Sequence, residues 1–203
     1  MSNPVCAYWF GSADADGVVR LGYDDGREVR TGETLTVDGD PVLCEHGLHA
    51  SRSVLDALAY GHGSVLACVR LSGTITEGDD KLAATMRETM WMGDVSATLH
   101  RFACEVAERA LRAQQAAGRE PDPRSWNVIA VKRRWLAGKA TDADLAQTDK
   151  AAWAATWDAE AAAWTVAWGA AAGAAGDQER AWQEAHLCEL LRADGVPVWE
   201  EAR

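Results

Sequence analysis

The sequence predicts an α+β protein, with a small, mostly antiparallel β unit carrying one short helix in residues 1–93 and a helical unit in residues 94–203. In the first part, short apolar runs alternate with turn-forming residues, as where VCAYWF precedes SADADG. From Asp94 onward, apolar residues recur every three to four positions, which is the spacing of one helix face. We therefore expect two domains that meet near residue 93.

The β-rich part should contain several strands and one helix. Four apolar segments are predicted to be strands, the last of them one strand or two: residues 5–10, 18–23, 64–75 and 81–92. Residues 28–44 alternate polar and apolar side chains, which is typical of a half-buried strand. Residues 51–61 place apolar side chains on one helix face, with Ser53 and Asp56 as a plausible N-cap pair.

The helical part should begin with a helix over 94–118, which Gly118 ends in the C′ position. A second helix is expected over 123–138, since proline suits a first helical turn. TDAD at 141–144 resembles a capping box and should start a third helix. A last helix is expected over 179–195, with Trp182, Ala185 or His186, Leu187 and Leu190 facing inward, and residues 196–203 should form an exposed tail.

The third helix carries an internal repeat. Two eleven-residue units, AAWAATWDAEA and AAWTVAWGAAA, place tryptophan at their third and seventh positions, namely Trp153, Trp157, Trp164 and Trp168. Eleven residues make three turns at ~3.67 residues per turn, so these indoles should form a nearly straight stripe. The stripe either packs within the chain or forms a ridge for self-association or for a partner protein.

Composition excludes several classes. The net charge of −11 and the isoelectric point near 4.9 make nucleic acid an unlikely partner. The chain has no stretch of eighteen apolar residues and no signal-peptide pattern, so we expect a cytoplasmic protein that does not cross a membrane. The five cysteines are widely spaced and odd in number, which favours reduced, buried thiols.

The segment CEHGLHAS at 44–51 concentrates chemistry-bearing residues just before the first helix. Cys44, His46 and His49 are zinc-ligand types, but a structural zinc site needs four ligands, so we expect no metal. Cys44 with a histidine could act as a nucleophile, although the acidic neighbours Asp40 and Glu45 oppose this. The favoured interpretation is a turn in which Gly47 takes positive φ and Cys44 and Leu48 are core.

Nearly the whole chain resembles a family of uncharacterised proteins of phages and actinobacteria. The resemblance rests on CEHGLHAS, on LSG at 71–73, on GDDK at 78–81, on TLHRFACEVAERAL at 98–111 and on the alanine–tryptophan repeats after Trp153. It implies a phage or prophage setting and implies no activity.

A second resemblance covers about a third of the chain. GLHASRSVLDALAYGHGSVLACVRLSG is similar to the part of ADP-ribosyltransferases that runs from Gly-Ile-Tyr-Phe-Ala through a short helix to a strand. It implies NAD as cofactor, with His49 where the family's nicotinamide-stacking tyrosine stands, and Glu88 as the candidate catalytic glutamate. The resemblance also implies a set of residues around the cofactor: Trp9, Gly11, Ser12, Ser51 and Tyr60. Phe10 stands where the family has a ribose-binding histidine.

Three functions therefore remain open from the sequence. The chain is an NAD-dependent ADP-ribosyltransferase-like enzyme that modifies a host target, or a non-catalytic protein that binds a host protein or a defence system, or an oligomer built through the tryptophan stripe.

Overall fold

The computed structural model describes residues 3–22, 26–147 and 174–199, and the chain divides into two compact units. One unit consists of Met1–Ser96 together with Leu187–Arg203, and the other is Ala97–His186. The fold is α+β as predicted, with the strands in the N-terminal part and most helices after them. The residues from Leu187 onward, which the sequence places in the helical domain, group with the β-rich unit.

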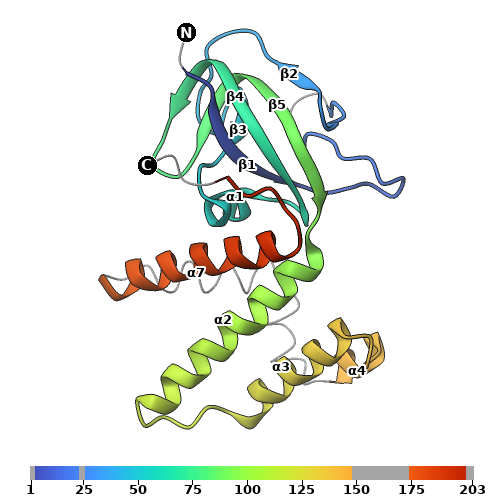
Figure 1. Ribbon diagram of the computed structural model, residues 1–203, viewed down its shortest axis with the longest axis vertical. Helices are drawn as coiled ribbons and strands as arrows, with labels where there is room; N and C mark the ends of the chain where they lie inside the picture. The colour runs from blue at the N-terminus through green and yellow to red at the C-terminus, as the bar shows by residue number, and fades with distance from the viewer. Residues whose placement is uncertain (1–2, 23–25, 148–173, 200–203) are drawn as a thin grey trace. The chain divides into compact units, whose positions relative to one another are not determined.

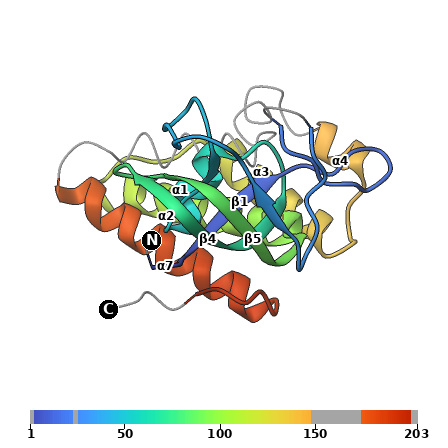
Figure 2. The same cartoon turned by 90° about the horizontal axis from the view of Figure 1, so that it is seen from above.

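Five strands of the first unit form one antiparallel sheet (Figure 1), and they are β1 (Val5–Gly11), β2 (Thr34–Thr36), β3 (Leu48–Ala50), β4 (Val65–Glu77) and β5 (Leu82–Asp94). The longest two, β4 and β5, run side by side in both views (Figure 1 and Figure 2). β1 pairs with the free edge of β4, and β2 and β3 pair with the other edge of β5. Tyr8 and Ser51 exchange two backbone hydrogen bonds of 2.8 and 2.9 Å, so β3 leads back to β1 and the sheet closes on itself.

The enclosed face of this sheet is the core of the first unit. It is built from alternate residues of the strands, because successive side chains point to opposite faces, and it includes Trp9, Leu48, Val69 and Leu71. Arg87 is also fully buried. Its guanidinium lies 4.5 Å from the centre of the Trp9 ring and donates a 2.8 Å hydrogen bond to the carbonyl oxygen of His49. A cation–π contact and a carbonyl acceptor therefore replace part of the water that this charge loses.

The helix α1 (Val54–Tyr60) packs against β1. The predicted cap is confirmed, since the Ser53 hydroxyl accepts a 3.1 Å hydrogen bond from the Asp56 amide. The chain leaving α1 passes very close to β1: a Cβ on Gly61 would lie 2.5 Å from the Phe10 Cβ, and one on Gly63 would lie 2.5 Å from the Gly11 carbonyl oxygen. Glycine at these two positions is what lets the loop cover the end of β1.

Several predicted elements differ from the structure. The described residues 18–22 contain only isolated bridges, at Val19 and Arg20, and residues 28–44 contain the three-residue strand β2 with isolated bridges at Glu28 and Val42. The segment 81–92 forms one strand, β5. The strands predicted over 18–23 and 28–44 are therefore wrong for most of their described residues. Alternation marks which side chains are buried, and here a loop buries Val19, Leu21 and Val29 with only single bridges between its residues.

The predicted exposed tail is also wrong for the part that the structure describes. Val196 is buried, and the Tyr8 hydroxyl accepts a 2.8 Å hydrogen bond from the Trp199 backbone amide. The Trp199 indole donates to the Ala7 carbonyl at 3.3 Å, and the Cys68 thiol donates to the Pro197 carbonyl at 3.3 Å. These contacts attach residues 196–199 to β1 and β4.

The second unit is helical. It contains α2 (Ser96–Ala116) from Ala97 onward, α3 (Pro123–Leu136), α4 (Asp142–Gln147) and α7 (Ala174–Ala193) up to His186. The predicted helix signals are confirmed: Gly118 and Gly138 take positive φ, Pro123 begins α3, and Thr141 and Asp144 form a reciprocal capping box.

The prediction for the inward face of the last helix needs correction, and the prediction for the tryptophan stripe concerns residues that the structure does not describe. The inward face of α7 is centred on Gln183, Leu187 and Leu191, whereas Ala185 is exposed and Trp182 is half-buried. The tryptophan stripe Trp153, Trp157, Trp164 and Trp168 lies outside the described residues.

Candidate functional site

The turn before β3 presents Cys44 in an unusual conformation. Val42 and His46 exchange backbone hydrogen bonds of 2.8 and 2.9 Å, which fold residues 42–46 back on themselves. Cys44 has φ of +66° and is the one non-glycine residue with positive φ in the described part of the chain. For an L-residue this conformation costs about 1–2 kcal/mol. The turn therefore exposes the cysteine at an energetic cost, and this contradicts the predicted core role of Cys44.

The turn between β4 and β5 holds a lysine against this cysteine. Lys81 Nζ lies 2.9 Å from Cys44 Sγ, although 37 residues separate the two in the sequence. Two contacts press the turns together: the Thr76 hydroxyl donates to the Pro41 carbonyl at 2.7 Å, and a Cβ on Gly78 would lie 2.8 Å from Leu43 Cδ1. The hairpin of β4 and β5 thus positions the ammonium group.

Tyr60, the last residue of α1, completes the surroundings of the lysine. Lys81 Nζ lies 4.0 Å from the centre of the Tyr60 ring, and the Tyr60 hydroxyl donates a 2.5 Å hydrogen bond to Asp80 Oδ2. Tyr60 as a whole is 44% exposed. Lys81 is therefore held between an aromatic face and a sulfur atom.

His49 supports the turn from β3. Its Nε2 accepts a 3.1 Å hydrogen bond from the Cys44 backbone amide, which leaves the ring proton on Nδ1. Burial lowers the pKa of His49, and the positive charges of Lys81 and Arg87 act in the same direction. The imidazole is therefore neutral near pH 7. We call the five residues Cys44, His49, Tyr60, Asp80 and Lys81 the Cys44 site.

The charges of the Cys44 site are set by its own contacts. The hydrogen bond to Cys44 raises the pKa of Lys81, and burial opposes this only in part. The hydrogen bond to Asp80 raises the pKa of Tyr60. The lysine is thus a cation and the tyrosine a neutral donor over the physiological range. A cation beside an accessible sulfur is the environment in which cysteines react as nucleophiles.

Apolar surface borders this polar cluster. Val42 and Tyr60, which are 45% and 44% exposed, are two of the three exposed large hydrophobic side chains found in the described residues. They flank the turn and the lysine, respectively. The Cys44 site therefore offers a molecule apolar contact next to a sulfur, an ammonium and a hydroxyl.

The structure brings two of the residues implied by the ADP-ribosyltransferase resemblance to one place, because His49 and Tyr60 both belong to the Cys44 site. The remaining cofactor residues lie on β1 or directly after β1 and β3. Trp9 is 9% exposed and Ser51 is 2% exposed. A Cβ on Gly11 would meet the Trp9 ring at 2.4 Å, so the indole lies directly over this glycine. Ser12 is exposed just beyond β1.

Glu88 lies elsewhere on the sheet. It follows Ala83, the partner of His49, by five residues along β5. At ~3.3 Å per residue, the backbone of Glu88 lies about 17 Å along β5 from that of Ala83, which is opposite His49. Glu88 pairs across the strands with Arg70, whose Nη1 lies 3.3 Å from its carboxylate. The structure therefore does not bring the two predicted catalytic residues together.

The cysteine predictions are partly corrected. Cys68, Cys104 and Cys188 are buried as predicted, and burial raises the pKa of Cys68 to about 12. Cys6 and Cys44 are exposed, which contradicts the prediction. The sequence pointed to Asp80 and Lys81 only as part of GDDK at 78–81, and the signal that could have placed them is the hairpin formed by two long strands on either side of this segment.

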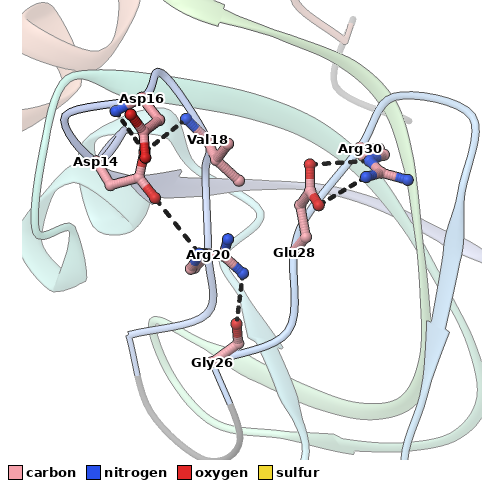
Figure 3. Close-up of polar contacts among 7 residues, drawn as sticks. All are labelled: Asp14, Asp16, Val18, Arg20, Gly26, Glu28 and Arg30. Carbon is pink, nitrogen blue, oxygen red and sulfur yellow. Dashed lines mark hydrogen bonds and ion pairs between the residues drawn. The ribbon is translucent and has the colours of Figure 1, made fainter.

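A second polar cluster, near Asp14, has a structural role (Figure 3). One carboxylate oxygen of Asp14 accepts hydrogen bonds from the amides of Asp16 and Val18 at 3.0 and 2.9 Å, and the other lies 3.4 Å from Arg20 Nε. The bond from Val18 is the largest cause that lowers the pKa of Asp14. The carboxylate is thus already used in closing the turn after β1.

Within the described residues, no group of three or more histidine, cysteine, aspartate or glutamate side chains is arranged to hold a metal ion, and His46 Nε2 contacts the Asp38 carbonyl at 2.6 Å. None of the helices found in the described ranges is long and apolar enough to span a bilayer. No protein-family model, no curated protein and no solved structure matches the chain. The phage setting, the use of NAD and a host partner therefore stay predictions.

Proposed function

We propose that the chain carries out thiol chemistry, with Cys44 as the nucleophile that attacks an electrophilic substrate on the surface of the first unit. The observation that carries this proposal is the 2.9 Å separation between Lys81 Nζ and the sulfur of an exposed cysteine. Nucleophilic catalysis requires an accessible sulfur and a group that stabilises its negative charge. Both are present in the Cys44 site.

Each residue of the site has a role in this proposal. Lys81 stabilises charge on the sulfur when it attacks. Asp80 and Tyr60 restrict where the lysine can lie, through the hydrogen bond between them and the aromatic face. His49 is a positioning residue, because its Nε2 holds the Cys44 amide and fixes the turn.

The size of the lysine effect follows from the distance. Two unit charges 2.9 Å apart attract by about 1.4 kcal/mol even at the dielectric constant of bulk water, which is about tenfold in rate. Salt reduces this value at an exposed pair. We expect Lys81→Met to slow the reaction of Cys44 by about three- to tenfold at low salt.

The test is alkylation of the full chain with iodoacetamide, with the rate at each cysteine followed by peptide mass spectrometry. Cys6, the other exposed cysteine, is the internal reference. Cys44 should react faster than Cys6, and Lys81→Met should slow Cys44 alone, while Lys139→Met in the second unit changes neither rate. Equal rates at the two cysteines, unchanged by Lys81→Met, would refute the proposal.

NAD-dependent ADP-ribosyl transfer is a second candidate function. The observation that favours it is that His49 and the exposed residue Tyr60 both belong to the contact network of Cys44 and Lys81, as two residues around one cofactor should. Calorimetric titration with NAD tests it, with Tyr60→Ala as the variant that should lose binding and Lys139→Met as the control. An absence of binding by the unmodified chain would end this candidate.

A further inference from the structure

The amine next to Cys44 can do more than stabilise charge. Lys81 Nζ is itself a nucleophile when it is deprotonated, and it already lies at hydrogen-bond distance from the sulfur. An oxidised sulfur at this position is an electrophile, because sulfenic acids condense with nearby nitrogen or sulfur nucleophiles. The pair is therefore placed for a covalent reaction between its two members.

We propose that the Cys44–Lys81 pair is a redox modification site, in which a hydroperoxide oxidises the sulfur and the lysine amine then closes on it to give a sulfenamide bridge. The inference rests on the proposed nucleophilicity of Cys44. The bridge joins the turn before β3 to the turn between β4 and β5, which are already in contact through Thr76 and Pro41. It therefore needs only a small movement of the flexible lysine side chain.

The reaction balances in two steps. The Cys44 sulfur attacks the outer oxygen of the hydroperoxide, the O–O bond breaks, and an alcohol or water leaves, so the sulfur is oxidised by two electrons and the peroxide is reduced by two. The Lys81 amine, after losing its ammonium proton to solvent, attacks the sulfur of the sulfenic acid. The S–O bond breaks, and hydroxide leaves and takes up the second amine proton as water. The products are the S–N bond, one water from the closing step, and one alcohol from an organic hydroperoxide or a second water from hydrogen peroxide.

Geometry selects Cys44 among the cysteines. Cys68, Cys104 and Cys188 are buried, so a peroxide reaches them poorly. Cys6 is exposed on β1 and is the comparison thiol in the same chain. Because its hydrogen bond to Cys44 raises the pKa of Lys81, the amine is scarce at neutral pH and the closing step should accelerate as the pH rises.

The bridge has a consequence for the site. It consumes the nucleophile and removes the positive charge of Lys81 from the face of Tyr60. Sulfenamides are opened again by thiols. The oxidised form is therefore an inactive state that a cellular thiol can reverse.

The experiment treats the full chain with hydrogen peroxide and analyses peptides by mass spectrometry, with dimedone added in a parallel sample to label sulfenic acid. The expected product is a Cys44–Lys81 linked pair that is lighter than the two peptides by two hydrogen atoms and is released by dithiothreitol. Lys81→Arg keeps the positive charge but lacks the amine, so this variant should give dimedone-labelled Cys44 and no linked pair.

The alternative outcomes separate the two proposals. Oxidation of Cys44 to sulfenic or sulfinic acid without a linked pair in the unmodified chain overturns the bridge and leaves the nucleophile in place. A linked pair that retains one oxygen atom overturns the sulfenamide form. Cys44 that stays reduced while Cys6 oxidises overturns both proposals.

Discussion

Gly47 gives the sharpest test of how the sequence builds the Cys44 site. Its φ of +117° is a conformation that L-residues rarely adopt, and it sits between the turn that presents Cys44 and the start of β3. A Cβ added here would lie 3.0 Å from the Pro41 Cβ, and 3.4 Å from both the Ala83 Cβ and the Ala84 carbonyl oxygen. Gly47→Ala therefore combines backbone strain with a steric clash.

The two effects can be separated with a matched glycine. Gly32 lies in the same unit with φ of +83°, and a Cβ there would meet nothing within 4 Å. Gly32→Ala should cost only the backbone strain of about 1–2 kcal/mol. Gly47→Ala should cost at least this amount, because φ of +117° lies farther from the left-handed helical region, and the overpacking of Pro41 and Ala83 adds about 1–3 kcal/mol. The loss of unfolded-state entropy on replacing glycine by alanine is common to both variants and cancels in the comparison.

The measurement is urea unfolding of the full chain followed by far-UV circular dichroism, and the quantity compared is the free energy of unfolding of the first unit. We expect Gly47→Ala to be less stable than Gly32→Ala by about 1–3 kcal/mol. Equal losses in the two variants would show that Gly47 contributes only its backbone freedom. The packing of the turn against Pro41 and β5 would then be refuted as the reason for glycine.

Three further predictions concern the same unit. Tyr8→Phe removes the acceptor of the Trp199 amide and should cost about 1–3 kcal/mol, with faster amide exchange at residues 196–199 as the measured sign. Leu48→Ala, at a fully buried position, should lower the free energy of unfolding by about 2–5 kcal/mol in the same urea assay. Asp14→Ala loses the acceptor of the Val18 amide. Because folding lowers the pKa of Asp14, the carboxylate stabilises the fold fully above its ordinary pKa, and this stabilisation is lost as the pH falls through the folded pKa. The melting temperatures of Asp14→Ala and the unmodified chain should therefore converge in acid.

The features that the sequence predicted well are those that depend on a few neighbouring residues. The cap at Ser53, the capping box of Thr141 and Asp144 and the positive φ of Gly47 and Gly118 are all present. Each follows from the hydrogen-bonding reach of one short side chain or from the absence of a Cβ. Such local causes are fully contained in a window of four or five residues.

The elements that failed depend on partners remote in the sequence. Whether residues 18–23 form a strand is decided by whether another strand offers its edge, and here β2 and β3 occupy the edge of β5 opposite β4. The segment 196–199 is short and contains a proline, yet the hydroxyl of Tyr8, 191 positions before Trp199, fixes it to β1. No periodicity in either segment carries this information.

The chemistry of Cys44 also depends on a residue that is remote in the sequence. Its sequence neighbours are acidic, and they argue against a reactive sulfur. The decisive neighbour is Lys81, in the turn just before β5. It reaches the sulfur because β3 pairs with the first residues of β5, and this pairing places the β4–β5 turn next to residues 42–46, which precede β3. The charge near a side chain in a turn therefore depends on which strands the sheet pairs beside that turn, and the residues next to Cys44 in the sequence do not contain this information. The reactivity of this cysteine is therefore a property of the β4–β5 hairpin as much as of the turn that contains it.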